Sequence, residues 1–297
     1  MTDRLLRSGL IIVDKPAGMT SHDVISRLRR IFRTRRVGHA GTLDPMATGV
    51  LVVGIERGTR FLAHLVTETK TYRATIRLGA STTTDDAEGD ITSRTDITDV
   101  TDTLIDAAIA QLTGDIMQKP AAVSAIKIDG KRAHERVRDG ETVDIPARPV
   151  TVHRFDVLDR RSVDGYIDLD VDVFCSSGTY IRSLARDLGN ALGVGGHLTA
   201  LRRTTVGPFD LTHARTLEEL EDNPQLSLTL DQALAVSFPI LRVSGEEGHK
   251  LAMGQWLEPR GLKGIHAAVT PDGQAVALVK EKGKRLATVF VARPSTL

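Results

Sequence analysis

The sequence predicts an α/β chain of the α+β type, with a mixed, largely antiparallel sheet followed by a small β-rich C-terminal domain. Residues 71–79 (TYRATIRLG) and 166–174 (YIDLDVDVF) alternate apolar and polar side chains, as strands with one buried face do. Helical patterns lie between the strands without the strict strand–helix repeat of a doubly wound sheet. Antiparallel pairing is therefore favoured.

The first elements are a short strand and a basic helix. Residues 10–13 form an apolar run that predicts a buried strand, and Pro16 and Gly18 predict a turn after it. Thr20 can cap the next helix, with Asp23 completing a capping box. Apolar residues of this helix share one stripe. Its opposite face carries four arginines: Arg27, Arg29, Arg30 and Arg33.

The middle of the chain continues with strands at 49–55 and 71–79. Tyr72 falls on the apolar side of the second strand. Residues 80–90 are polar and acidic, and we expect a mobile loop there. A helix follows over 102–114.

A long excursion from the sheet is expected at about 118–150. The strand at 166–174 and a helix over 176–193 come next. We place a boundary near 237–239, because the chain beyond it shows only short strands around the turns PDGQ and KEKGK. The predicted domains are residues 1–237 and 238–297.

Charge is unevenly distributed. Residues 1–60 carry 11 Lys/Arg against 5 Asp/Glu, residues 81–115 carry 1 against 9, and residues 240–297 carry 9 against 5. Two basic ends suit a polyanion such as nucleic acid, although two solvated faces would give the same pattern. The single Cys175 excludes an internal disulfide and a multi-cysteine zinc site. With no long apolar stretch, we expect a cytoplasmic protein without membrane contact.

One glycine-rich segment, VGHAGTLDPMATG at 37–49, surrounds Asp44. A carboxylate on such a loop can be a nucleophile, a general base or a metal ligand. The structural alternative is an Asx-turn, in which the side chain caps its own loop. No metal-binding spacing is present, so we expect no metal.

Arg182 lies beyond the apolar strand at 166–174, and we expect it in the first turn of a helix. The positive end of a helix disfavours an arginine, which indicates that Arg182 has a carboxylate or phosphate partner. The alternative is a surface arginine folded back over the helix.

These segments resemble the bacterial tRNA pseudouridine-55 synthases, the TruB family. The catalytic loop GHAGTLDPMATGVLVVG is similar over its whole length, and five further motifs fall in the family's order between residue 10 and about 210. They are KPAGMTSHDV, KTYRATIRLG, QKPAAVSAIKIDGKRAHERVRDG, CSSGTYIRSLARDLGNALG and LRRTTVGPF. The tail, with AMGQWL and PDGQAVALV, is similar to a PUA RNA-binding module.

The resemblance implies roles for individual residues. Asp44 matches the nucleophilic aspartate, Tyr72 the tyrosine that stacks on the target base, and Arg182 the arginine paired with the catalytic carboxylate. Residues that contact the flipped nucleotide or replace it in the stem-loop are matched by His39, Tyr180 and Leu201. Lys15 and Pro16 match a motif that braces the site. We expect Arg27, Arg30 and Arg33 to lie near phosphates.

The implied reaction isomerises uridine to pseudouridine at position 55 in the T-arm loop of tRNA. It needs no cofactor, because it contains no redox or phosphoryl step. The implied protein is a monomer without an obligate protein partner. Ala121, Val123 and His134 depart from the family's usual residues within the excursion, which affects RNA docking and not the reaction.

Two other functions stay open on the residues alone. A non-catalytic protein that binds tRNA and helps it fold would also need the basic helix and tail, but not a carboxylate facing phosphates. A glycosidase or nucleosidase acting through Asp44 would need a second carboxylate, and none stands at a readable spacing.

Overall fold

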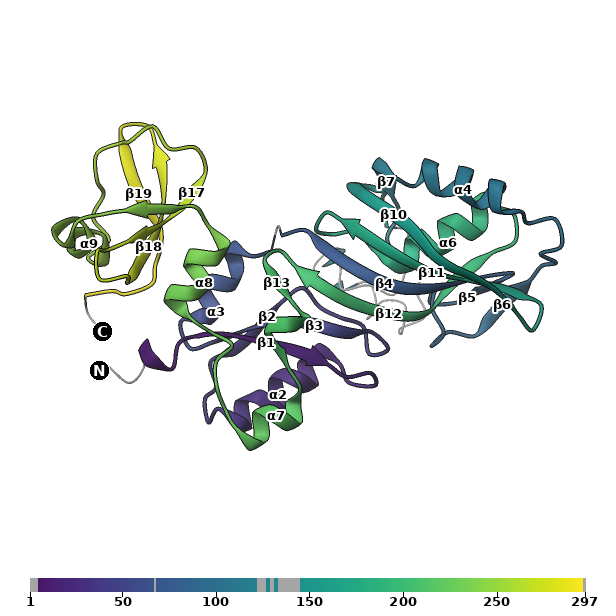
Figure 1. The fold of residues 1–297 in the computed structure, drawn as a ribbon, viewed down its shortest axis with the longest axis horizontal. Helices are drawn as coiled ribbons and strands as arrows, with labels where there is room; N and C mark the ends of the chain where they lie inside the picture. The colour runs from purple at the N-terminus through teal and green to yellow at the C-terminus, as the bar shows by residue number, and fades with distance from the viewer. Residues whose placement is uncertain (1–4, 67, 122–126, 129–130, 133–144, 296–297) are drawn as a thin grey trace. The chain divides into compact units, whose positions relative to one another are not determined.

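The computed structural model describes residues 5–66, 68–121, 127–128, 131–132 and 145–295. The chain forms two compact units (Figure 1). The first combines residues 1–67 with 205–297, and the second comprises residues 68–204.

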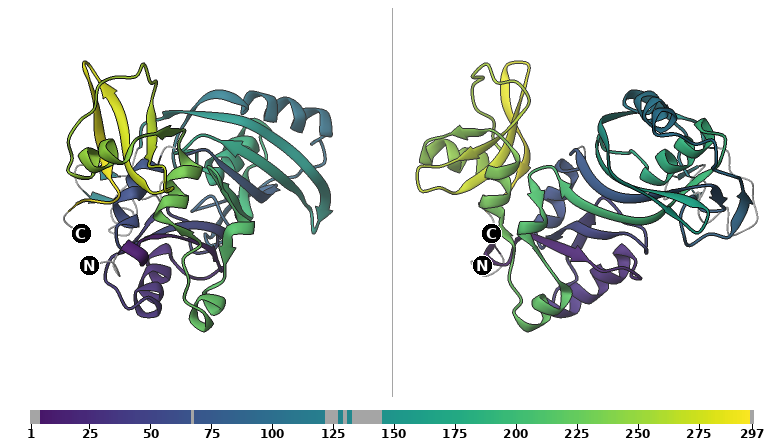
Figure 2. Two further views of the ribbon diagram at one scale, coloured as in Figure 1. Left: turned by 60° about the vertical axis from the view of Figure 1, so that its left-hand side comes forward. Right: turned by 45° about the vertical axis from the view of Figure 1, so that its right-hand side comes forward.

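The first unit contains a sheet with the strand order β14-β1-β3, to which β15 and β2 add at β1 and β3. Its N-terminal elements are β1 (Gly9–Lys15), α2 (Ser21–Ile31), β2 (Val37–Ala40), β3 (Thr48–Ile55), α3 (Gly58–Phe61) and a 3-10 turn at Leu62–His64. Its later elements are β13 (Phe209–Asp210), a 3-10 turn at Leu211–His213, β14 (Ala214–Arg215), α7 (Leu217–Asp222), β15 (Leu228–Thr229) and α8 (Leu230–Ser237). Helices α2 and α7 lie side by side (Figures 1 and 2).

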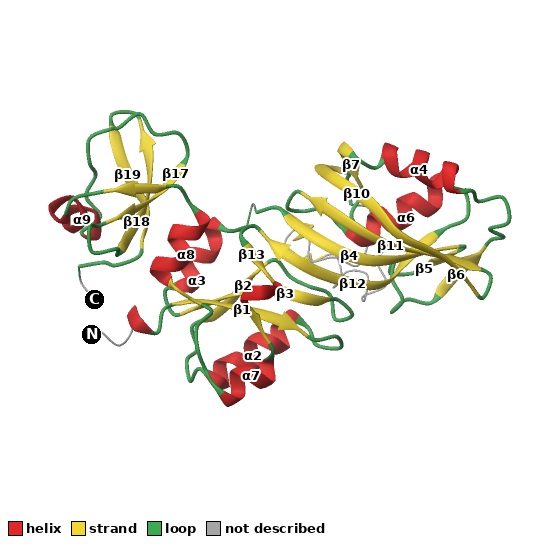
Figure 3. Ribbon diagram, viewed as in Figure 1, coloured by secondary structure: helices red, strands yellow, loops and turns green. Residues whose placement is uncertain are grey.

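The same unit ends in a four-stranded sheet with the order β16-β17-β18-β19, in which only β16 runs parallel to its neighbour (Figure 3). Its elements are β16 (Ile240–Arg242), α9 (Gly245–Ala252), β17 (Ile265–Val269), β18 (Ala275–Lys282) and β19 (Arg285–Val291). The predicted turns at PDGQ and KEKGK are confirmed, since they join β17 to β18 and β18 to β19.

Two apolar clusters hold this unit together. One joins β1, β3 and α8 to the C-terminal sheet, through residues such as Leu10, Val52, Leu234 and Phe290. The other belongs to the C-terminal residues alone and includes Leu251 and Leu286 among its members. The C-terminal sheet therefore has a core of its own and also contributes to a larger one.

The second unit is built on strands in the order β12-β4-β11-β10-β7, of which β4, β11, β10 and β7 pair antiparallel. Its elements are β4 (Lys70–Leu78), β5 (Ala80–Thr82), β6 (Ile91–Arg94), α4 (Asp102–Gln111), β7 (Gly114–Gln118), β8 (Lys127–Ile128), β9 (Lys131–Arg132), β10 (Arg148–Val163), β11 (Tyr166–Cys175), α6 (Ile181–Ala191) and β12 (Gly196–Val206), the last of which ends in the first unit. Helix α6 packs on β4 and against α4.

Most elements expected from the sequence are confirmed. Thr20 caps α2 and forms the full capping box with Asp23. On β4 the expected face is buried, because Tyr72, Ala74, Ile76 and Leu78 are all less than 9% exposed. The expectation for residues 80–90 is wrong in part. Residues 80–82 form β5, and Asp86 is 2% exposed and bridges to Leu198. Within the excursion, Ala121 is buried, whereas Val123 and His134 lie outside the described residues.

Candidate active site

The loop that carries Asp44 joins β2 to β3 and is held by its neighbours. Ser21, the first residue of α2, accepts a hydrogen bond from the Leu43 amide at 2.9 Å and donates one to the Leu43 carbonyl at 3.0 Å. Gly41 and Gly49 have φ angles of 74° and 98°, which other residues rarely adopt. The backbone on both sides of Asp44 is therefore fixed, while the residue itself stays half-buried.

Lys15 holds the same loop through hydrogen bonds of its ammonium group. Its side chain is fully buried, and its ammonium donates to the carbonyls of Pro16 (2.8 Å), Met19 (2.6 Å) and Pro45 (3.2 Å). The Pro45 carbonyl also accepts from the Gly18 amide at 2.9 Å. A buried ammonium is stable only with such partners. Lys15 therefore ties the turn after β1 to the residue that follows Asp44.

Tyr72 and Arg182 belong to the second unit. Tyr72 lies on β4 opposite Val173 of β11 and is 7% exposed. Arg182 lies in the first turn of α6, as predicted, and is 5% exposed. Its Nη1 is 3.4 Å from the Asp86 carboxylate and donates to the Thr84 carbonyl at 3.0 Å.

Asp86 is the functional candidate that sequence reasoning missed. Its carboxylate also accepts hydrogen bonds from the Glu88 amide at 3.0 Å and the Thr84 hydroxyl at 2.5 Å. These donors fix the carboxylate before any substrate binds. Arg182 itself signalled such a partner, but its carboxylate lies 96 positions away in a segment that looks like a polar loop.

The start of α6 is fixed by Gln118, the last residue of β7. Gln118 is 1% exposed; its Oε1 accepts from the Tyr180 amide at 2.8 Å, and its Nε2 donates to the Tyr180 carbonyl at 3.1 Å. Arg186 adds an ion pair to Asp85 at 3.1 Å. Burial raises the pKa of Asp85, and the charges of Arg186 and Arg182 oppose this rise.

Lys70, two residues before Tyr72 on β4, is also buried. Lys70 is 8% exposed and donates to the Glu68 carbonyl at 2.9 Å and to the Ser177 hydroxyl at 3.3 Å. Burial, reinforced by the charge of Arg203, lowers the pKa of Lys70 to about 8. Burial also raises the pKa of Cys175 to about 11, which disfavours the reactive thiolate form.

The other predicted site residues lie on β2, on β12, and in or just after α2. His39 lies on β2 opposite Val53, and Leu201 is 8% exposed on β12. On α2, the Arg27 guanidinium pairs with Glu221 at 2.6 Å and Glu218 at 3.2 Å, both on α7. Arg30 and Arg33 are exposed. The charge of Arg27 is thus engaged within the protein, and we keep the expectation of phosphate contacts for Arg30 and Arg33.

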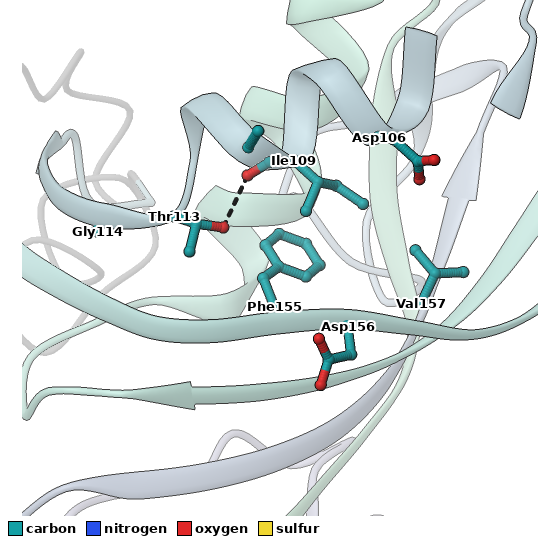
Figure 4. A pocket seen from close by; sticks show the side chains of 8 residues that line it. Asp106, Ile109, Thr113, Gly114, Phe155, Asp156 and Val157 are labelled. Carbon is teal, nitrogen blue, oxygen red and sulfur yellow. Dashed lines mark hydrogen bonds between the residues drawn. The ribbon is translucent and has the colours of Figure 1, made fainter. Parts of the chain in front are cut away.

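A hollow lies on the second unit, between α4 and β10 (Figure 4). Its volume is about 740 Å³, and its lining residues include Ile109, Phe155, Asp106 and Asp156. None of the predicted site residues lines it.

No group of three or more His, Cys, Asp or Glu side chains in the described part of the chain could hold a metal. In the same residues, no helix is long and apolar enough to span a membrane.

Comparison with known proteins decides the family. The profile described as "TruB family pseudouridylate synthase (N terminal domain)" matches residues 29–181. Two C-terminal profiles, described for tRNA pseudouridylate synthase B and tRNA pseudouridine synthase II, match residues 182–235 and 238–293. The chain belongs to the TruB family.

Relatives with similar sequences align with the whole or nearly the whole chain. A protein of Corynebacterium efficiens named tRNA pseudouridine synthase B is 73% identical over 297 residues, with both chains fully covered. A protein of Nocardia farcinica with the same name is 60% identical and covers 97% of this chain and 94% of its own.

Solved structures give the same fold. A chain of an archaeal Cbf5–Nop10 complex has a TM-score of 0.72 at 27% identity and covers 99% of this chain and 89% of its own. A chain of an H/ACA ribonucleoprotein bound to a substrate RNA has a TM-score of 0.73 at 26% identity, with 99% and 88% covered. The predicted pseudouridine synthase fold and enzyme class are confirmed.

Proposed function

We propose that this enzyme isomerises uridine to pseudouridine at position 55, in the T-arm loop of tRNA. The observation that carries the proposal is the anchoring of Asp44, whose neighbours are fixed by Ser21 and Lys15 while the residue itself stays half-buried. A rigid carboxylate of this kind serves chemistry better than a flexible loop does.

The reaction exchanges one bond for another at the ribose. The C1′–N1 glycosidic bond of uridine breaks, the base turns, and C1′ joins C5; N1 then carries a proton, and C5 loses one. Asp44 attacks or stabilises C1′ while the base is detached, as carboxylates do in glycoside chemistry. Water must be excluded, because it would hydrolyse the opened intermediate.

The other residues support this step. Tyr72 offers an aromatic face to the flipped uracil, which offsets part of the cost of unstacking it, and its hydroxyl takes part in proton transfer. Arg182 favours the ionised form of the catalytic carboxylate. Asp86 acts as a positioning residue, because it holds the guanidinium of Arg182.

RNA recognition falls to residues around these groups. We assign His39, Tyr180 and Leu201 to the flipped nucleotide and its place in the stem-loop, and Arg30 and Arg33 to phosphates. The module at 238–297 is assigned to RNA binding. We further propose a cytoplasmic enzyme that is a monomer without an obligate protein partner. Light scattering of the purified protein tests the monomeric state.

The decisive experiment incubates the protein with a tRNA transcript and maps pseudouridine. We expect modification at position 55 and none with Asp44→Asn, whose RNA affinity should stay within about tenfold of the parent. Asp222→Asn, at an exposed site at the end of α7, is the control and should keep full activity. Tight binding without any product in the parent protein would favour the non-catalytic tRNA-folding alternative.

A further inference from the structure

Strand β10 is longer than the strand that pairs with it at the edge of the sheet. β7 pairs with residues 148–152 of β10, and β10 continues to Val163. In the part of the chain that the structure describes, no strand pairs with β10 beyond Val152 on this edge. Backbone N–H and C=O groups therefore lack a strand partner there, and such an edge is a template for another strand.

The regular part of this edge is four residues long. The pairing of β10 with β11 shifts register on both sides of residues 154–157, so bulges bound this stretch. Four residues are enough for a short added strand. Phe155 and Val157 point towards α4 on one face of β10, and Asp156 points to the other face (Figure 4).

The hollow between α4 and β10 adjoins this stretch. Its lining includes Phe155, Asp156 and Val157 from β10, together with Ile109 and Ala110 from α4. Val157 is 37% exposed and Ala110 is exposed as well, whereas Ile109 and Phe155 are buried. Helix α4 thus forms one wall of a groove beside the free edge. Its volume of about 740 Å³ falls in the range of ligand sites.

The groove carries an excess of negative charge. Helix α4 belongs to residues 81–115, which carry 9 Asp/Glu against 1 Lys/Arg. The Asp106 carboxylate lines the groove and makes no ion pair or hydrogen bond with any residue that the structure describes. Asp156 pairs with Arg154 at 3.0 Å, but Arg154 also pairs with Asp172, so one guanidinium serves two carboxylates. This surface repels phosphates and attracts cations.

We propose that the groove between α4 and residues 154–157 of β10 binds an extended segment of a partner protein, in which apolar side chains alternate with Lys or Arg. The free edge selects a polypeptide, because a peptide backbone repeats N–H and C=O groups at the spacing of a strand. An added strand turns alternate side chains towards α4 and the others towards the face of Asp156. Apolar side chains suit the first set and cationic ones the second, and Asp106 adds to the attraction. The inference goes beyond the proposed function and does not depend on it.

The test titrates the full chain into a labelled hexapeptide of alternating lysine and valine and follows the fluorescence anisotropy. We expect saturable binding with a Kd of about 100 µM or tighter at low salt. The same peptide with glutamate in place of lysine should not bind. N-methylation of alternate peptide bonds removes N–H donors but keeps the side chains, and it should abolish binding. Hydrogen exchange of the complex should show new protection at residues 154–157.

Two variants on α4 have matched controls on or near the same helix. Ala110→Phe fills the groove from an exposed position and should weaken peptide binding by about tenfold or more. Ala107→Phe adds the same ring at an exposed position that does not line the groove, and should bind like the parent. Asp106→Asn should weaken binding about threefold, the scale of an exposed charge pair. Asp99→Asn removes an exposed charge outside the groove and should have no effect.

Several outcomes would overturn the proposal. They are the absence of binding, equal binding of the glutamate or N-methylated peptide, and parent-like affinity in Ala110→Phe. Dimers of the chain alone that Ala110→Phe dissociates would also overturn it, because the groove would then hold a second copy. All four variants should modify a T-arm stem-loop at the parent rate, since no predicted site residue lines the groove. An inactive parent protein would contradict the proposed function, and peptide binding would still be measurable.

Discussion

Tyr72 lies on the buried face of β4, where an ordinary core tyrosine would also lie. Tyr72→Phe separates the two roles. We expect a melting temperature and RNA affinity near those of the parent, because the ring is kept and the loss of one hydrogen bond costs about 1 kcal/mol. The single-turnover rate should fall about a hundredfold, the scale of a lost proton-transfer group.

Tyr166 gives a matched control for this variant. It is also 7% exposed in the same unit, and the Cζ atoms of Arg77 and Arg94 lie 4.9 and 4.5 Å from the centroid of its ring. Tyr166→Phe should keep the parent rate. If Tyr72→Phe keeps it too, the hydroxyl has no chemical role and Tyr72 is only a stacking platform.

Lys70 gives a prediction about stability and pH. Its pKa is lowered to about 8 by burial, whereas the unfolded chain has the ordinary value near 10.5. Between these values the unfolded state binds the extra proton, so the free energy of unfolding rises with pH. Below pH 8 the folded protein bears the full cost of the buried charge, about 3 kcal/mol.

Lys70→Met should therefore gain stability relative to the parent at pH 7 and lose this advantage by pH 10. Urea unfolding at both values measures the difference. Lys282→Met removes an exposed ammonium and should show no such change with pH. An advantage of Lys70→Met that is equal at both pH values would mean that the ammonium is not destabilised by burial.

Asp86 shows what could not be predicted at the scale of residues. The sequence predicts catalytic roles for Asp44, Tyr72 and Arg182, because each stands in a long motif that resembles the family's. Asp86 has no such signal, and its role becomes visible only when the fold brings it to Arg182, through hydrogen bonds from Thr84 and Glu88 that no spacing rule anticipates.

At the scale of elements, the position of α6 depends on one amide side chain. Gln118→Met would remove the acceptor of the Tyr180 amide, at a cost of about 1–3 kcal/mol. The Tyr180 carbonyl would lose the Gln118 donor but keep the Leu184 amide at 3.1 Å. We expect the single-turnover rate to fall about tenfold, because Tyr180 and Arg182 shift together. Gln118→Glu keeps the acceptor for the Tyr180 amide and should recover part of the rate.

Thr113 is the control for this prediction. Its hydroxyl donates to the Ile109 carbonyl at 2.8 Å at the end of α4 (Figure 4), a helix that carries no predicted site residue. Thr113→Val should lower stability without lowering the rate of the folded protein. A parent-like rate in Gln118→Met would show that α6 is positioned by its packing alone.

Arg30 lies in the last turn of α2, whereas Arg33 lies two residues beyond the helix with a φ of 50°, so the expectation that Arg33 shares the helix face is wrong. Both are exposed and can be tested for phosphate contacts. Replacing Arg30 and Arg33 by Ala should weaken tRNA binding and flatten its salt dependence, each lost contact lowering the log–log slope by just under one unit. Arg27→Ala removes the same charge, but this charge is paired with Glu221 and Glu218, so the slope should stay unchanged. Equal slopes in all three proteins would mean that this face is merely solvated.

The sequence predicts helices and strands better than it predicts how they contact one another. The capping box of α2 and the alternation of β4 and β11 depend on residues a few positions apart, and both were predicted. The β5 strand was missed, because its three residues pair with the exposed β6 in a segment whose composition is that of a loop. The first turn of the predicted 176–193 helix is instead a loop that ends at Tyr180.

At the scale of the molecule, the predicted boundary at 237 crosses a shared core. Phe290 of β19 lies 6.0 Å from Phe61 by ring centroids, and Arg57 donates to the carbonyls of Val291 and Ala292. Asp231 of α8 accepts from the Ala275 amide at 2.8 Å and pairs with Arg293. The contacts of Phe290 and Arg57 join segments more than 200 residues apart, and those of Asp231 join segments 44 and 62 residues apart, so no local pattern reveals them.

This core predicts that residues on both sides of the boundary unfold together. Phe290→Ala should cost about 3–5 kcal/mol and lower hydrogen-exchange protection in β1 and β3 as well as in β17–β19. Ile240→Ala, at a half-exposed position in the same C-terminal sheet, should change neither. Loss of protection confined to residues 240–292, with a separate melting transition, would show that the C-terminal module folds on its own and that the contacts of Phe290 with Phe61 add little to the rest of the unit.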